Sequence, residues 1–127
     1  MDTILLLRHL GPGLHFLGHG SDDDIDLLER IIEEELELNP GKPPIVALFT
    51  EFPSNPLLRS VNLPRLRALA DTYDFPIVVD DTIGNYANVH VIPYADIVVT
   101  SLSKAFSGEA NVMGGRYVPQ PFPKNAL

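Results

Sequence analysis

The sequence predicts an α/β fold in which helices pack on a parallel sheet. Short apolar runs bounded by polar residues alternate along the chain with segments whose apolar residues recur at helical spacing. The resulting order of strand, helix, strand, crossover and strand is the usual sign of a parallel sheet. The 127 residues suffice for one domain with a modest core, and 45% hydrophobic and 20% charged residues are typical of a globular chain.

The first clear helix is expected to begin after Ser21, whose hydroxyl can cap it. Asp24 follows three residues later, as in a capping box with Asp in place of Glu. The acidic run 22–24 also suits the positive end of the helix dipole. Apolar residues then recur on one face, and Asn39-Pro40-Gly41 ends the helix. The residues of that face are Ile25, Leu28, Ile31, Ile32 and Leu36.

A second helix is expected from about Asn62, which can cap it, with Pro64 tolerated in the first turn. Its apolar face holds Leu63, Leu66, Leu69, Ala70 and Tyr73. Strands are expected at 45–50, 76–79 and 97–99, with a fourth within 112–118. The first of them is a continuous apolar run, which predicts a buried strand.

Composition excludes several classes of function. Nine basic and 17 acidic residues give a net charge of −8, which disfavours nucleic acids and anionic membrane surfaces as partners. The chain has no cysteine, which excludes disulfides, thiolate zinc sites and cysteine nucleophiles. No run approaches the roughly 20 apolar residues of a membrane span, and we expect a cytoplasmic protein. His15 and His19 are four residues apart, but glycines flank His19, so no metal site is predicted.

Polar residues follow three of the expected strands. In a parallel sheet the carboxyl ends of the strands lie on one rim, where binding sites form. The stretch between Asp81 and Asp96 has room for a single crossover, so Asp80 and Lys104 are expected on the same rim of neighbouring strands. An acid, hydroxyls and a lysine would then converge. Acids after strands also serve as helix caps, and a lone lysine is usually solvated, so geometry alone leaves both interpretations open.

Three segments together resemble the Cys/Met-metabolism family of pyridoxal phosphate (PLP) enzymes. Residues 96–108, DIVVTSLSKAFSG, resemble its lysine signature of an acid, an apolar strand and Ser-x-Thr-Lys. Residues 78–82, VVDDT, resemble its Val-Asp-Asn-Thr, and residues 51–58, EFPSNPLL, resemble its Glu-x-Pro-Ser-Asn-Pro. All three occur in the family order at compatible spacing. The sequence at residues 84–85 and 111–115 is most similar to that of fungal cystathionine γ-synthases.

The resemblance implies PLP as the cofactor and a role for five residues. Lys104 would hold PLP as an imine and shuttle protons at the substrate carbons. Asp80 would pair with the pyridine nitrogen and keep it protonated. Ser101 and Ser103 would donate to the cofactor phosphate, and Asn55 would lie beside the phenolic oxygen of the ring.

Two residues within these segments differ from the residues usual in the family motifs. Ser103 stands in place of the usual Thr and keeps the hydroxyl, whereas Asp81 stands in place of Asn and adds a charge next to Asp80. Since successive side chains of a strand point to opposite faces, the two carboxylates are expected to be separated.

The fold implied by the resemblance is the parallel-sheet core of the large domain of fold type I PLP transferases. Family members are several hundred residues long, so residues 1–127 are expected to be an incomplete PLP-binding domain, with 1–20 and 119–127 peripheral. The implied function is transsulfuration, in which an activated homoserine ester and a thiol such as cysteine are joined by γ-replacement.

The implied partners are a small amino-acid substrate and further copies of the chain. Two alternatives stay open. One is β- or γ-elimination within the same family, and the other is a catalytically inactive remnant or interaction piece.

Overall fold

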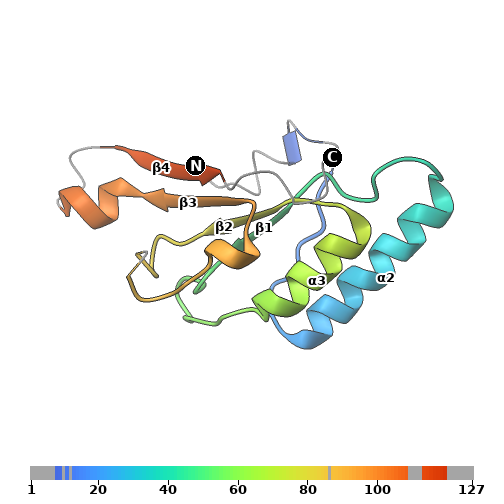
Figure 1. Cartoon of the computed structure of the whole chain (residues 1–127), viewed down its shortest axis with the longest axis horizontal. Coiled ribbons are helices and arrows are strands. Elements are labelled where there is room, and N and C mark those ends of the chain that lie inside the picture. Colours follow the sequence, from blue (N-terminus) through green and yellow to red (C-terminus); the bar gives the residue numbers. More distant parts are fainter. Residues whose placement is uncertain (1–7, 10, 12, 86, 109–112, 120–127) are drawn as a thin grey trace.

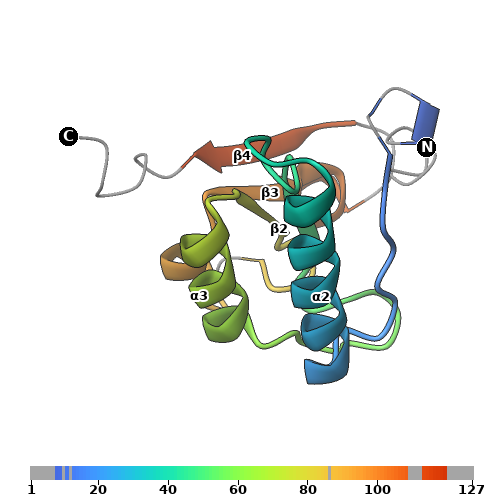
Figure 2. The same ribbon diagram turned by 90° about the vertical axis from the view of Figure 1, so that its right-hand side faces the viewer.

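The computed structural model describes residues 8–9, 11, 13–85, 87–108 and 113–119 of the chain. The described residues form two layers, with helices α2 (Asp22–Leu38) and α3 (Leu63–Tyr73) side by side against one face of a four-stranded sheet (Figures 1 and 2). The strands lie in the order β1 (Leu48–Glu51), β2 (Ile77–Asp80), β3 (Ile97–Ser101), β4 (Gly115–Pro119). Two short helical turns, η1 (Ile92–Tyr94) and η2 (Ser103–Ser107), flank β3.

Both predicted helices are confirmed, together with their caps. The Ser21 hydroxyl accepts from the backbone N–H of Asp24 at 3.3 Å, and the Asn62 side chain accepts from that of Arg65 at 3.2 Å. One detail of the capping box differs. The Asp24 carboxylate accepts from the N–H groups of His19 and Gly20 at 2.8 and 2.9 Å, because the chain turns at Gly20 and brings those donors to it.

The α/β fold with a parallel core is confirmed, and the fourth strand makes the sheet mixed. β1, β2 and β3 run parallel, whereas β4 pairs with β3 antiparallel. The N–H groups of Leu102 and Ser103 both donate to the carbonyl of Gly114, at 2.9 and 3.3 Å. These bonds close the connection at the end of the sheet where β3 stops, so the chain must run back along β3.

The sheet is covered by helices on one face only within the described ranges. Apolar side chains of β2 and β3, namely Ile77, Val79 and Val98, join those of α2 and α3 in one core. β1 begins three residues later than expected and is only half-buried, and Phe49 is 54% exposed on it. The prediction of a buried first strand was wrong, because that prediction needs cover on both faces.

Asp96 connects three elements through hydrogen bonds. It is the first residue of the segment that resembles the lysine signature. Its carboxylate accepts from the N–H of Ile77 at 2.7 Å and from the guanidinium of Arg67 at 2.8 Å. The starts of β2 and β3 are thereby tied to α3. Because both donors meet one half-buried acceptor, and one of them is charged, each bond contributes to stability.

Replacing Asp96 with alanine is expected to lower the free energy of unfolding by about 2–3 kcal/mol, since it removes two hydrogen bonds to a charged group. Urea titration followed by circular dichroism measures the change. Asp71→Ala is the matched control, because Asp71 also pairs with Arg67 at 2.8 Å but is 66% exposed in its side chain. An exposed helical pair of this kind is worth about 0.3–0.5 kcal/mol. Equal losses in the two variants would contradict the role given to Asp96.

Candidate active site at the carboxyl ends of the strands

The ends of β2 and β3 lie side by side and carry the predicted acid and hydroxyl. Asp80 is the last residue of β2 and is paired in register with Val99 of β3, two residues before Ser101. Asp80 is half-buried, whereas Asp81 is only 1% exposed. Since Val79 belongs to the core, alternation places Asp80 on the face away from the helices and Asp81 toward them, in agreement with the expected separation.

Thr82 holds the Asp80 carboxylate in place. Oδ1 of Asp80 accepts from the backbone N–H of Thr82 at 2.9 Å and from its hydroxyl at 2.5 Å. The same hydroxyl oxygen accepts from the N–H of Ser101 at 2.9 Å. The carboxylate is therefore connected through one side chain to the end of the neighbouring strand.

A hollow of about 360 Å³ opens at this rim. The residues that line it come from the end of β2 and the turn after it, the end of β3 and the start of β4. Its lining residues are Asp80, Thr82, Val99, Thr100, Ser101, Gly115, Arg116 and Tyr117. A carboxylate and hydroxyl groups on one surface suit a ligand that carries both a basic nitrogen and a group that accepts hydrogen bonds.

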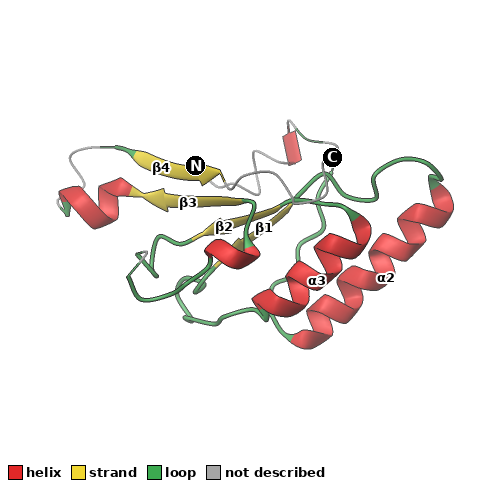
Figure 3. Ribbon diagram, viewed as in Figure 1, coloured by secondary structure: helices red, strands yellow, loops and turns green. Residues whose placement is uncertain are grey.

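Lys104 follows this rim directly. It lies three residues after Ser101, in η2, which projects beyond the end of β3 (Figure 3), and its side chain is exposed. Ser103 opens the same turn, and its hydroxyl accepts from the N–H of Gly114 at 3.1 Å. Asn55 lies in the loop after β1, exposed, and its N–H donates to the Glu51 carboxylate at 2.9 Å.

The structure thus brings Asp80 and Ser101 together in the hollow. It places Ser103 and Lys104 in the next turn of the chain and Asn55 beyond the end of the adjacent strand. β1 pairs with β2 so that Glu51 faces Asp80, which puts all five predicted residues at the same end of the sheet.

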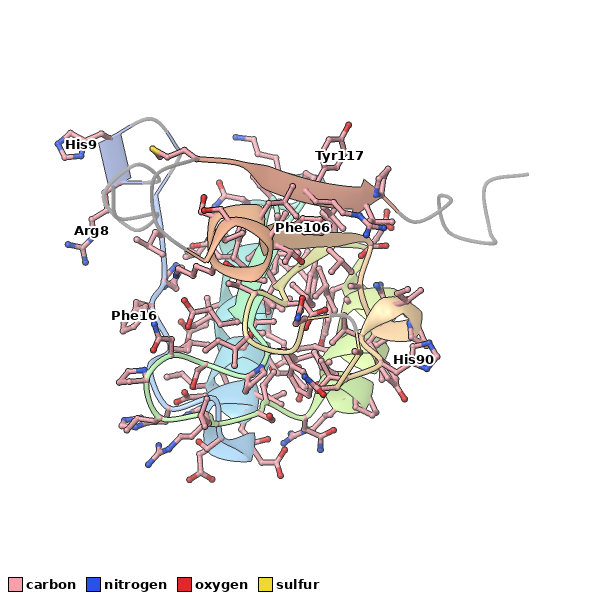
Figure 4. All side chains as sticks on the ribbon, turned by 90° about the vertical axis from the view of Figure 1, so that its left-hand side faces the viewer. Arg8, His9, Phe16, His90, Phe106 and Tyr117 are labelled. Carbon is pink, nitrogen blue, oxygen red and sulfur yellow. The ribbon has the colours of Figure 1, made fainter. Side chains whose placement is uncertain are left out.

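Six residues that line the hollow were given no role from the sequence, namely Thr82, Val99, Thr100, Gly115, Arg116 and Tyr117. Thr82 was noted as part of a motif and among the polar residues after the second strand, without a role of its own, although a hydroxyl two residues after an acid is a usual partner for that acid. Arg116 and Tyr117 come from β4, whose antiparallel pairing sets Arg116 opposite Thr100 and Tyr117 opposite Val99. Tyr117 extends from the face away from α2 and α3 (Figure 4).

Comparison with known proteins gives the family. Residues 25–124 match the family model described as Cys/Met metabolism PLP-dependent enzyme. The chain belongs to this family. It is 68% identical over 117 residues to the cystathionine gamma-synthase-like enzyme iboG1 of Amanita muscaria, a match that covers 92% of this chain and 19% of that protein. It is 49% identical over 122 residues to the cystathionine gamma-synthase of Neurospora crassa, covering 95% of this chain and 18% of that protein.

A solved structure shares the fold. A crystal structure of an O-acetylhomoserine (thiol)-lyase of Campylobacter jejuni, which contains N'-pyridoxyl-lysine-5'-monophosphate, superimposes with a TM-score of 0.62. It is 24% identical to this chain and the match covers 79% of this chain and 23% of that one. The chain spans about a fifth of the length of the curated relatives it matches.

PLP is the cofactor of this family, and the residues of the rim fit it. A lysine amine, a carboxylate with one oxygen already fixed by Thr82, and hydroxyl donors are groups that a phosphorylated pyridine aldehyde needs. The described residues contain no group of three His, Asp or Glu that could hold a metal ion. Nor does any helix among them combine the length and apolar character needed to cross a membrane.

Proposed function

We propose that this chain supplies the cofactor-binding rim of a PLP enzyme that joins an activated homoserine ester to a thiol such as cysteine by γ-replacement. The observation that carries the proposal is the placement of Lys104 three residues beyond the end of β3, next to the strand that ends in Asp80. The relatives named cystathionine gamma-synthase or cystathionine gamma-synthase-like support the choice of reaction.

Each rim residue has a task that follows from its chemistry. Lys104 is exposed and carries the amine that can attach the aldehyde covalently and afterwards move a proton at the substrate carbons. Asp80 holds a proton on the ring nitrogen through the carboxylate oxygen that Thr82 does not occupy. Bound PLP supplies an electron-withdrawing ring that stabilises negative charge on the substrate.

The hydroxyls and Asn55 are proposed to orient the cofactor. Ser101 lines the hollow and can donate to a phosphate. Ser103 shares the donor set but is engaged with Gly114, so it would serve the phosphate by turning its hydroxyl proton away from the Gly114 carbonyl, 3.4 Å distant. Asn55, exposed on its loop, is proposed to lie beside the phenolic oxygen of the ring.

A chimaera tests the reaction. This chain replaces the matching segment of the Neurospora crassa relative, which then provides the remaining length. Incubation with PLP, an acylated homoserine and cysteine is expected to give a thioether that joins both substrates, measured by mass spectrometry. A keto acid and ammonia in its place would show elimination. No product from the chimaera, while the unaltered relative is active, would overturn the proposal.

We also propose that copies of the chain associate through the sheet face away from the helices. Phe49 is 54% and Tyr117 69% exposed, and both lie on that face by register. Burying such apolar surface favours association. Phe49→Ser is expected to weaken self-association measured by sedimentation velocity, whereas Leu38→Ser, at a more exposed site at the end of α2, is expected to leave it unchanged. The reverse order would contradict this interface.

A further inference from the structure

We infer that Thr82 is a positioning residue that sets the Asp80 carboxylate for the cofactor and couples it to the strand leading to Lys104. The inference rests on the proposed role of Asp80. It is carried by three hydrogen bonds, two from Thr82 to Asp80 and one from Ser101 to Thr82.

The direction of each bond is fixed by the chemistry of the groups. An ionised carboxylate only accepts and a backbone N–H only donates. The Thr82 hydroxyl must therefore give its single proton to Oδ1 of Asp80 and offer a lone pair to the N–H of Ser101. With its proton and one lone pair engaged, the hydroxyl cannot rotate without losing at least one bond. The hydroxyl bond to the carboxylate is 2.5 Å long, in the range of charge-assisted O–H···O⁻ bonds.

The two bonds from Thr82 orient the carboxylate. Both fall on Oδ1, so neither occupies Oδ2. With one oxygen anchored by a backbone and a side-chain donor, rotation of the carboxylate about its own axis is restricted at a residue that lines the hollow. A ring nitrogen would then meet an acceptor that is already in place, which lowers the entropic cost of binding.

The third bond links the acid to the lysine segment. β2 and β3 are last paired in register at Asp80 and Val99, and the Thr82 hydroxyl adds a cross-strand bond beyond that pair. Ser101, which it reaches, is three residues from Lys104. Thr82 therefore fixes the spacing between the strand end that holds the ring nitrogen and the turn that holds the amine.

The choice of threonine is consistent with this task. A β-branched side chain has few allowed rotamers, so its hydroxyl is held in one direction by the backbone itself. Serine would keep the hydroxyl with more rotamer freedom. Valine would keep the shape of the side chain and lose the two bonds of the hydroxyl, to Asp80 and from Ser101.

Two readouts on the 127-residue chain test the inference. The first needs no cofactor. In Thr82→Val the N–H of Ser101 loses its acceptor, and its hydrogen exchange measured by NMR is expected to speed up about tenfold. Thr82→Ser is expected to restore exchange to within about threefold of the unaltered chain. Thr72→Val is the matched control, because the Thr72 hydroxyl donates to Ala68 within α3 and should not affect Ser101.

The second readout is the PLP concentration for half-saturation, followed by the absorbance of the bound cofactor. Thr82→Val is expected to raise the PLP concentration for half-saturation about tenfold, and Thr82→Ser is expected to restore the value of the unaltered chain. Asp80→Asn separates the two claims. If Asp80→Asn leaves PLP binding unchanged, the proposed role of Asp80 fails. If Asp80→Asn weakens PLP binding while Thr82→Val does not, only the positioning role of Thr82 is overturned.

If the amide hydrogen exchange of Ser101 is unaltered in Thr82→Val, the inference is overturned, whatever the result of the PLP-binding measurement. If the valine variant does not fold, Thr82→Ser decides. Ser101 exchange and PLP binding close to those of the unaltered chain would support the hydroxyl as the working group, and loss of either would contradict it.

Discussion

Replacing Lys104 with alanine is expected to abolish the covalent attachment of PLP to this chain. Attachment needs a primary amine next to the rim that holds the ring, and alanine has none. Lys104 is exposed and lies in the turn directly after Ser101, so its amine is free to condense with an aldehyde. The absorbance of the desalted protein after incubation with PLP measures the loss, which is expected to be complete above the level of nonspecific labelling.

Lys42→Ala is the matched control for this variant. The chain contains three lysines, Lys42, Lys104 and Lys124. Lys42 is exposed in the turn after α2 and has no part in the rim, so its removal is expected to leave the specific absorbance unchanged. Lys104→Arg, which keeps the charge without a condensing amine, is expected to behave like the alanine variant. Retention of the absorbance in both Lys104 variants would contradict the assignment.

Replacing Gly84 with alanine is expected to cost about 3 kcal/mol of stability, the upper end of the usual range for overpacking. A Cβ at this position would lie 2.0 Å from Oδ1 of Asp81 and 2.2 Å from Cγ2 of Val89. Asp81 is almost fully buried, so its carboxylate has little room to move aside, and its backbone bonds to Val99 and Asn85 hold the turn. Glycine is required at position 84 because the surrounding side chains leave no room for a Cβ. Urea titration at equilibrium measures the change.

Gly114→Ala is the control, because a Cβ there would have Leu102 Cβ at 3.7 Å as its nearest neighbour, an ordinary contact. Gly114 pairs with Leu102 and Ser103 through its backbone, which alanine keeps. Its cost is expected to stay within about 0.5 kcal/mol, as for most substitutions away from packed positions. Similar losses at Gly84 and Gly114 would show that the turn after Asp81 adapts, contrary to the packing described.

Local chemistry explains what the sequence could predict. Ser21 and Asn62 are caps whose partners lie three residues away, so both helix starts could be recognised from short segments. The rim was predicted because parallel strands put their carboxyl ends together, and Asp80 and Ser101 indeed line one hollow. The roles of all five residues, including those of Asp80 and Ser101, came from the resemblance to the family, and they remain predictions.

Bonds between residues distant in sequence account for what was missed. Asp96 meets the N–H of Ile77 and the guanidinium of Arg67 only once three elements have packed. Thr82 reaches Ser101 across two strands, 19 residues along the chain. The antiparallel direction of β4 depends on the bonds of Gly114 to Leu102 and Ser103, and the sequence pattern of residues 112–118 does not predict those bonds. The same pairing brings Arg116 and Tyr117 to the hollow.

The most direct test of the central claim is to locate the bound cofactor. The unaltered chain is incubated with PLP, reduced with borohydride, digested and mapped by mass spectrometry. The account predicts that the reduced pyridoxyl group is found on Lys104, well above Lys42 and Lys124. Labelling spread evenly over the three lysines, or absent from Lys104, would contradict it.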